Sequence, residues 1–234
     1  TMFFDNKITK IDPSDRVLEV GPGSSPYFRS DVLLDKQFSE EEGILQRGGK
    51  LQISYEKPIL YYQNLPFPFK DKEFDYVISS HVLEHIKIDE VDLFIKELER
   101  IAKKGYIECP KFTYEYLFNF KVHTTLINYK NGEMLILPKD KVVFTPIQDM
   151  FYELFKEGFA IKPQRLIEDF IDFFMFGFEW DQKIPYKIVD SIDMLVDNDD
   201  LLRLKEYFAK LKILESSKPK DSLLKKVFKK IFRR

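Results

Sequence analysis

Short apolar runs alternate with amphipathic segments over the first half of the chain. Four of these runs predict buried strands. They are Arg16–Val20, Val32–Leu34, Phe74–Ser79 and Gly105–Cys109. Between the last two, apolar residues recur with helical spacing across Asp89–Lys103. Strands that alternate with helices predict a doubly wound α/β fold with a mostly parallel sheet.

The pattern changes after Pro110. Asn131 and Gly132 stand between two apolar flanks, which is the strongest short signal for a β-hairpin. Two later segments, Phe174–Trp180 and Tyr186–Val189, predict a further antiparallel pair of strands. Helical spacing predicts three more helices. They are Ile147–Lys156, Gln164–Phe173 and Leu201–Leu214.

The composition is that of an ordinary globular chain, with 234 residues of which 44% are hydrophobic and 32% charged. Cys109 is the only cysteine, so no intramolecular disulfide can form, and a reducing cytoplasm fits best. The first residues show no basic segment followed by an apolar one, so we expect no signal peptide. No apolar run reaches the roughly 18 residues of a membrane span.

A glycine-rich turn follows the first predicted strand. The segment Glu19–Ser25 contains Gly21 and Gly23, with Pro22 between them. Glycine lets a nucleoside-bearing cofactor approach the backbone closely, and it permits backbone angles that a Cβ forbids. Asp35, at the end of the second strand, can accept hydrogen bonds from both hydroxyls of a ribose. Together the two elements predict a nucleoside-binding edge of the sheet.

Two more segments follow in order along the chain. Asn64–Pro68 precedes the strand start Phe74-Asp75, and Ser80–His85 directly follows that strand. With the glycine turn, they resemble the class I S-adenosylmethionine-dependent methyltransferases, in particular the type 11 group. That group typically shows an acidic-x-Gly-x-Gly turn, a Leu-Pro-Phe segment, a Phe-Asp strand start and a short His-x-Leu-x-His helix. The resemblance covers roughly residues 16–110.

The resemblance implies a Rossmann-like sheet of seven strands, in which the two segments after residue 173 would be the final strands. It implies S-adenosylmethionine as cofactor and a small-molecule, lipid-linked or glycan-precursor acceptor. The residues implied in cofactor binding are Glu19, Gly21, Pro22, Gly23, Asp35, Lys36, Asn64, Leu65, Ser80 and His81. The glycine turn would line the methionine end, Asp35 would hold the ribose, and Asn64 and Leu65 would lie near the adenine.

The chain departs from the family pattern in two places. Ser24, Ser25 and Pro26 replace the usual third glycine, so we expect a short or distorted helix after the turn. Tyr61 stands where an acid often precedes the Leu-Pro-Phe segment. These departures leave open a cofactor-binding scaffold without turnover. A nicotinamide-binding domain is disfavoured, because Phe28 stands where its last glycine would be.

The segment from His81 to His85 also matches the His-x-x-Glu-His pattern of zinc proteases. Two histidines four apart on a helix share a face and could hold a metal ion, with Glu84 as the base. That pattern should lie within a long helix, whereas here it directly follows a strand. The context therefore favours a structural role for His85, and we predict no metal site.

Methyl transfer from a sulfonium is an in-line displacement, so a base is needed only if the nucleophile must lose a proton. Three candidates for that role are His81, Glu108 and His123. Glu108 ends the fourth strand, at the edge where such sheets bind ligands. His123 lies in an insertion of about residues 111–163, which we expect to cover the substrate.

The last residues predict a basic amphipathic tail, residues 216–234, attached to a methyltransferase domain of residues 1–215. From Lys218 onward the chain has eight basic side chains and one acid, whereas the rest carries a net charge of −9. Within Leu223–Arg234, apolar and basic residues occupy opposite helical faces, as in helices that lie on anionic membranes. A cytoplasmic protein peripheral to the inner membrane face is one hypothesis. Docking of the tail on its own domain or on a partner is the other.

The acidic body and the pI near 6.0 argue against a nucleic-acid partner, and the oligomeric state has no signal in the sequence. Co-sedimentation with liposomes distinguishes the two hypotheses for the tail, using the full chain and a version that ends at Ser217. Equal lack of binding by both proteins would reject the membrane hypothesis.

Overall fold

The computed structural model describes residues 2–47, 57, 59–157, 170–196 and 202. The chain divides into two compact units, Thr1–Leu195 and Val196–Arg234. Almost all described residues belong to the first unit. The predicted helix Leu201–Leu214 and the basic tail lie outside the described residues, apart from Leu202. Among the described residues, no helix combines the length and apolar character that crossing a membrane requires.

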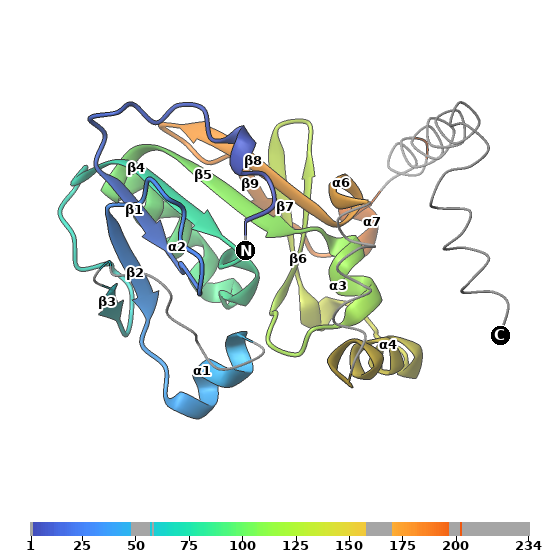
Figure 1. The fold of residues 1–234 in the computed structure, drawn as a ribbon. Coiled ribbons are helices and arrows are strands. Elements are labelled where there is room, and N and C mark those ends of the chain that lie inside the picture. The colour runs from blue at the N-terminus through green and yellow to red at the C-terminus, as the bar shows by residue number, and fades with distance from the viewer. Residues whose placement is uncertain (1, 48–56, 58, 158–169, 197–201, 203–234) are drawn as a thin grey trace, which may run out of the picture. The chain divides into compact units, whose positions relative to one another are not determined.

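A six-stranded sheet forms the centre of the first unit (Figure 1). Its order is β3 (Ile59–Tyr62), β2 (Val32–Lys36), β1 (Val17–Val20), β4 (Phe74–Ser80), β5 (Ala102–Pro110) and β8 (Met175–Asp181). All neighbouring pairs are parallel except β5 and β8, which run antiparallel. This arrangement confirms the predicted Rossmann-like sheet with an antiparallel final strand.

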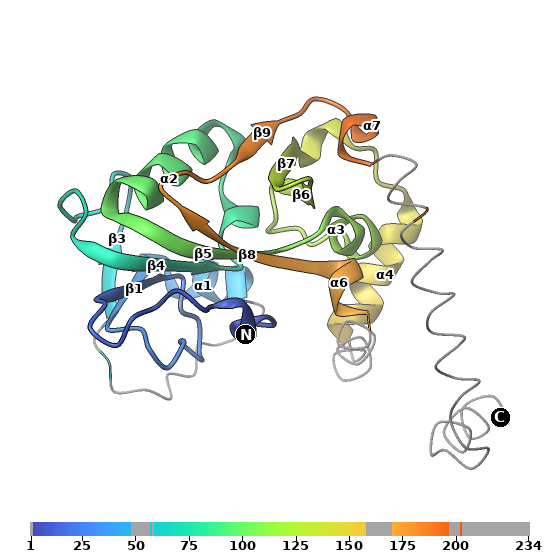
Figure 2. The same ribbon diagram turned by 90° about the horizontal axis from the view of Figure 1, so that it is seen from above.

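Both faces of the central strands are covered, which explains why their sequences are nearly continuous apolar runs. Helix α2 (Ile88–Ile101) covers one face through Val91, Phe94 and Leu98, all fully buried. On the opposite face lie α1 (Glu40–Arg47) and the N-terminal segment with its short 3-10 helix η1, Asp5–Lys7 (Figure 2). Phe4 packs there in one cluster with the buried rings of Tyr76 and Tyr106.

The sequence placed some boundaries imperfectly. Strand β3 was not predicted. The helix predicted at Asp89–Lys103 ends two residues earlier, because β5 begins directly after α2 at Ala102. The helix expected after the glycine turn is absent. Residues 21–31 connect β1 to β2 through turns, which agrees with the position of Pro26 so close to the turn.

A second sheet, β6-β7-β9, stands beside the main one (Figure 1). Strands β6 (Thr125–Lys130) and β7 (Glu133–Pro138) form the predicted hairpin. Both turn residues have positive φ, 53° at Asn131 and 82° at Gly132, as a two-residue hairpin of this type requires. The ring of Tyr129 stacks on Phe176 and Phe178 of β8, which joins the two sheets through one core.

The prediction of seven strands in the main sheet was wrong. Strand β9 (Tyr186–Ile188) does not pair with β8, but runs parallel to β7 in the second sheet. Backbone hydrogen bonds fix it there, from Met134 N to Pro185 O at 2.9 Å and from Val189 N to Ile136 O at 2.9 Å. The inserted hairpin provides a free edge for β9, so the family's usual last pair is divided between two sheets.

The remaining elements are short helices around the second sheet. They are η2 (Leu83–His85), α3 (Phe112–Phe118), η3 (Lys139–Lys141), α4 (Pro146–Glu157), α6 (Ile171–Phe174) and α7 (Ile192–Leu195). Helix α4 confirms the predicted helix at Ile147–Lys156. Most of the helix predicted at Gln164–Phe173 lies outside the described residues, and α6 occupies its last part.

Candidate functional site

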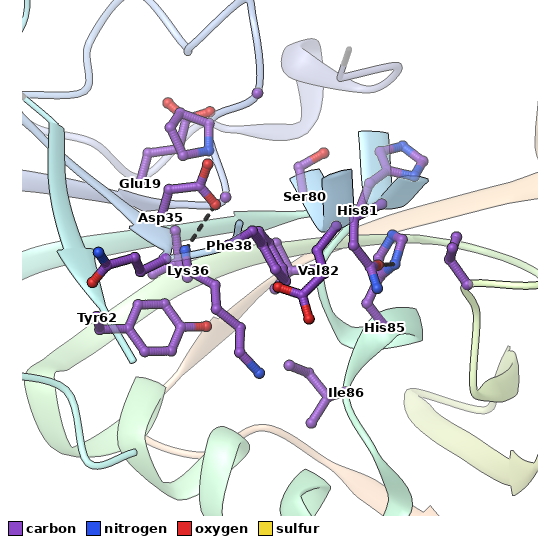
Figure 3. Close-up of a pocket in the computed structure, with 18 of the residues that line it drawn as sticks. Glu19, Asp35, Lys36, Phe38, Tyr62, Ser80, His81, Val82, His85 and Ile86 are labelled. Atoms are coloured by element: carbon purple, nitrogen blue, oxygen red, sulfur yellow. Dashed lines mark hydrogen bonds between the residues drawn. The ribbon is translucent and has the colours of Figure 1, made fainter. Parts of the chain in front are cut away.

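A pocket of about 750 Å³ opens at the carboxyl ends of β1, β2 and β4. The strand order reverses there, because β2 follows on one side of β1 and β4 lies on the other. Open α/β sheets bind ligands at such switch points. Figure 3 shows Glu19 and Asp35 on one side of the pocket and His81 and His85 on the other. We call these the glycine half (residues 19–25 and 35–38) and the histidine half (residues 80–87).

The glycine turn needs its first glycine for two separate reasons. Gly21 has φ +69°, and a Cβ at this position would lie 2.4 Å from Cγ2 of Val82. Its N–H donates to Leu34 O at 2.8 Å, which fixes the turn against β2. Gly23 has φ +56° and open space around it, so a side chain there would enter the pocket region. The turn therefore exposes backbone to a ligand where side chains would exclude it.

Glu19 holds the loop that follows the turn. Its Oε2 accepts hydrogen bonds from Tyr27 N at 2.8 Å and Ser30 Oγ at 2.6 Å. Burial raises the pKa of the Glu19 carboxyl, because the surrounding donors only partly replace water. Glu19 also lines the pocket, as the resemblance implied, but its contacts show that it shapes the loop from within.

Asp35 lies at the carboxyl end of β2 and lines the pocket. Its side chain is largely buried, and its Oδ1 accepts a hydrogen bond from Lys36 N at 2.9 Å, drawn as a dashed line in Figure 3. Pro22, Gly23 and Lys36 border the same space. The structure thus gathers all the residues implied for the methionine and ribose ends of the cofactor.

Asn64 and Leu65 do not line the pocket, so the structure does not support the predicted adenine contacts. Asn64 is exposed, and Leu65 packs against the core. The segment is drawn onto α2 instead: Phe67 N donates to Glu97 Oε2 at 2.7 Å, and Arg100 donates to Phe67 O at 3.2 Å. Tyr62, at the end of β3, lines the pocket in their place, a residue that the sequence interpretation missed.

His81 stands at the start of the loop after β4. It has φ +56°, and its N–H donates to Glu108 O at 2.8 Å. Its ring lies between two buried carboxylates, with Nδ1 3.3 Å from Glu84 Oε1 and Nε2 3.2 Å from Glu108 Oε1. Burial alone would lower the pKa of His81, but Glu108 and Glu84 raise it to about 9. A histidine with this pKa is protonated at neutral pH, and a protonated ring does not accept the proton of an acceptor, so the charge does not favour the predicted base role.

Glu108 is enclosed by protein on every side and is not among the residues that line the pocket. Its oxygens accept hydrogen bonds from Phe3 N at 2.7 Å, Phe4 N at 2.9 Å and the Tyr106 hydroxyl at 2.7 Å. Burial would raise its pKa, but His81 and these donors lower it. The geometry of Glu108 suits an anchor for the N-terminal segment. A general base would have to reach the acceptor in the pocket, and Glu108 does not line the pocket.

His123 lies beside His85, with ring centroids 4.5 Å apart and edge-to-face geometry. The insertion brings it there, because Thr124 N donates to Glu84 O at 2.8 Å and Thr124 Oγ1 donates to Ile86 O at 2.6 Å. His85 lines the pocket, whereas His123 does not. Burial lowers the pKa of His85 to about 4, so its ring is neutral at pH 7.

The zinc-protease pattern does not form. It needs His81 and His85 on one helical face, but η2 has only three residues, Leu83–His85, and His81 precedes it with a positive φ. The His81 ring points to Glu84 and Glu108 instead. The sequence of residues 81–85 matches the zinc-protease pattern, but the segment does not form the helix that this kind of zinc site requires.

Comparison with known families gives one match. Residues 57–107 match a family model described as a methyltransferase domain, of the type 11 group. The matched segment is less than half of the chain and runs from β3 into β5, so it includes the loop after β4 but not the glycine turn. It confirms the resemblance to class I methyltransferases. No curated protein sequence matches the chain.

Several solved structures are similar to this one at low identity. A protein from Pyrococcus horikoshii OT3 is 16% identical over 60% of this chain and 72% of its own, with a TM-score of 0.34. An S-adenosylmethionine-dependent methyltransferase from Thermotoga maritima is 19% identical over 50% and 60%, with a TM-score of 0.35. Another from Mesorhizobium loti is 15% identical over 52% and 56%, with a TM-score of 0.31. The chain spans less than two thirds of the length of both methyltransferases.

Proposed function

We propose that the protein binds S-adenosylmethionine in this pocket and transfers its methyl group to an acceptor bound beside it. The observation that carries the proposal is that three predicted binding elements meet at one pocket. The glycine turn after β1, Asp35 at the end of β2 and the loop after β4 border one pocket at the switch point of the sheet. The family match over residues 57–107 supports the same class of reaction.

The residues present fit the cofactor. The turn at Gly21 and Gly23 offers backbone without side chains, and the Asp35 carboxylate suits a pair of ribose hydroxyls. A volume of about 750 Å³ lies within the usual range of sites for such ligands. When bound, the cofactor supplies a methyl group that its sulfonium already activates.

In this proposal the protein promotes methyl transfer mainly by positioning the acceptor. None of the three predicted bases is an unprotonated group on the pocket wall, because His81 is a cation, Glu108 is enclosed and His123 stands behind His85. Holding the nucleophile close to the methyl group and in line with it is then the main contribution of the protein. A small-molecule, lipid-linked or glycan-precursor acceptor remains our proposal for the substrate, and we place it in the same pocket, which both halves line.

Calorimetric titration with S-adenosylhomocysteine tests cofactor binding. We expect micromolar binding by the wild-type chain and a loss of about 10- to 100-fold in Asp35→Ala, the value of one or two charge-assisted hydrogen bonds. Asp140→Ala is the matched control, because Asp140 is exposed and does not line the pocket. Absence of binding by a folded wild-type protein would overturn the proposal. Binding without methylation of any acceptor would favour the non-catalytic scaffold.

A further inference from the structure

A group of metal-ligating side chains, one buried and two partly buried, includes two residues of the histidine half and one residue beside it. Glu84, His85 and His123 each direct one donor atom to a common region, and these atoms lie within 4.8 Å of one another. Two come from η2 after β4, and the third comes from the loop that precedes β6. The Thr124 hydrogen bonds that tie β6 to η2 hold this loop in place.

Glu84 gives a second and independent indication of a ligand. Its side chain is 1% exposed, and among the described residues neither carboxylate oxygen has a hydrogen-bond donor. His81 lies at ion-pair distance, 3.3 Å, but without hydrogen-bond geometry. The His81 cation compensates the charge at Oε1, whereas Oε2 has no donor, and a buried carboxylate oxygen without a donor is costly because water no longer solvates it. A bound cation would remove this cost.

The two histidines are oriented by their neighbours as metal ligands commonly are. His85 Nδ1 lies 2.9 Å from Gln46 Oε1, and His123 Nδ1 contacts Glu115 Oε1. An oxygen that accepts from Nδ1 places the proton there and leaves the lone pair on Nε2. Lys139 Nζ, 3.3 Å from Glu115 Oε2, keeps that carboxylate in position.

We propose that Glu84, His85 and His123 bind one divalent transition-metal ion of the zinc class. Two imidazoles and one carboxylate form a ligand set that suits Zn²⁺, whereas Mg²⁺ and Ca²⁺ prefer oxygen ligands. Donors around a tetrahedral zinc ion stand about 3.4 Å apart, so binding would draw the three side chains together. The open fourth position would lie near the pocket that His85 lines. A role for it toward the acceptor rests on the proposed function, but the metal site does not.

Zinc titration of protein without a polyhistidine tag tests the proposal, by competition with a chromophoric chelator. The wild-type chain should bind one Zn²⁺, and His123→Gln should weaken binding by about 100-fold or more, above the usual effect of an outer-shell change. Asp140→Ala is the control, because Asp140 is exposed and does not line the pocket, and it should bind zinc as the wild type does. Absence of stoichiometric zinc, or binding by His123→Gln as tight as that of the wild type, would overturn the proposal.

A measurement on the wild-type chain alone covers the case in which His123→Gln does not fold. X-ray absorption at the zinc edge should show two imidazole ligands and otherwise oxygen. A sulfur ligand or a single imidazole would contradict the assigned set. S-adenosylhomocysteine titration of the same preparation separates the two proposals, because zinc binding without nucleoside binding rejects only the proposed function, and the reverse result rejects only the metal site.

Discussion

The two halves of the pocket are built in different ways. The glycine half uses backbone: Gly21 and Gly23 have positive φ, and one carboxylate, Asp35, stands at a strand end. The histidine half uses buried charge: the His81 cation lies between Glu84 and Glu108, and neutral His85 lies against His123. The first half is a short-range feature of one turn, whereas the second depends on contacts between distant parts of the chain. Substitutions should therefore affect ligand binding in the first and stability in the second.

The largest effect should follow from Gly21→Ala. The added Cβ would meet Val82 and would also force a non-glycine residue to a φ of +69°, so we expect loss of S-adenosylhomocysteine binding by more than about 100-fold. The φ penalty alone is about 1–2 kcal/mol of stability. Calorimetry and thermal unfolding measure the two quantities.

Gly132→Ala is the control for that experiment. Gly132 has φ +82° in the hairpin turn, with no atom within 4 Å of an added Cβ, so it carries a similar backbone penalty far from the glycine turn in sequence. Its variant should lose stability but keep nucleoside binding. Wild-type affinity in Gly21→Ala would show that the glycine half does not contact the cofactor.

Glu108→Gln should mainly destabilise the fold. The substitution leaves His81 without one of its two carboxylates and weakens the acceptor for Phe3 N and Phe4 N. Breaking a buried ion pair on one side costs about 3–5 kcal/mol, and we expect a loss near the lower value because the amide still accepts hydrogen bonds. Urea unfolding measures it.

Glu179→Gln is a matched variant for the N-terminal segment. Glu179 accepts hydrogen bonds from Thr9 N, Lys10 N and the Tyr76 hydroxyl, but it is only partly buried, so water solvates part of its charge, and a glutamine would still accept these bonds. Its variant should unfold close to the wild-type urea concentration. Equal destabilisation by Glu108→Gln and Glu179→Gln would mean that the buried charges of the histidine half contribute no more to stability than the contacts of Glu179 do.

A smaller effect concerns pH. The folded pKa of His81, about 9, lies above the value of about 6.5 for an unfolded histidine. Its contribution to stability is therefore complete below about pH 6.5 and is lost as pH rises through 9. We would measure the free energy of unfolding at pH 7 and at pH 9.5, with chelator present. It should decrease from pH 7 to pH 9.5 by more in the wild type than in His81→Gln.

The difference between those two proteins isolates His81, because the buried Cys109 thiol, whose pKa burial raises, affects both in the same way. An NMR titration should also give a midpoint near 9 for the ring of His81. A midpoint near 6.5 would show that the His81 ring is not a stabilised cation at neutral pH.

The outcome for individual residues follows the same division. The hairpin at Asn131 and Gly132, the strand that ends at Asp35 and the glycine turn were all predicted, because each depends on a few adjacent residues. Asn64 and Leu65, predicted to contact adenine, do not line the pocket, because Glu97 and Arg100 hold that segment against α2. The local sequence pattern does not indicate that Glu97 lies close to Phe67.

The sequence by itself determined the alternation of strands and helices, the glycine turn and the acid that faces it, since backbone preference and hydrophobic period act over a few residues. Only the tertiary structure decided that β9 leaves the main sheet for β7, that Glu108 closes on the N-terminal segment, and that His123 meets His85 across 38 positions of chain. The pairing of β9 with β7 and the contact of His123 with His85 depend on the inserted segment, whereas the contact of Glu108 depends on the N-terminal segment. Their energy comes from burial and hydrogen bonding between segments, which no local pattern of residues records.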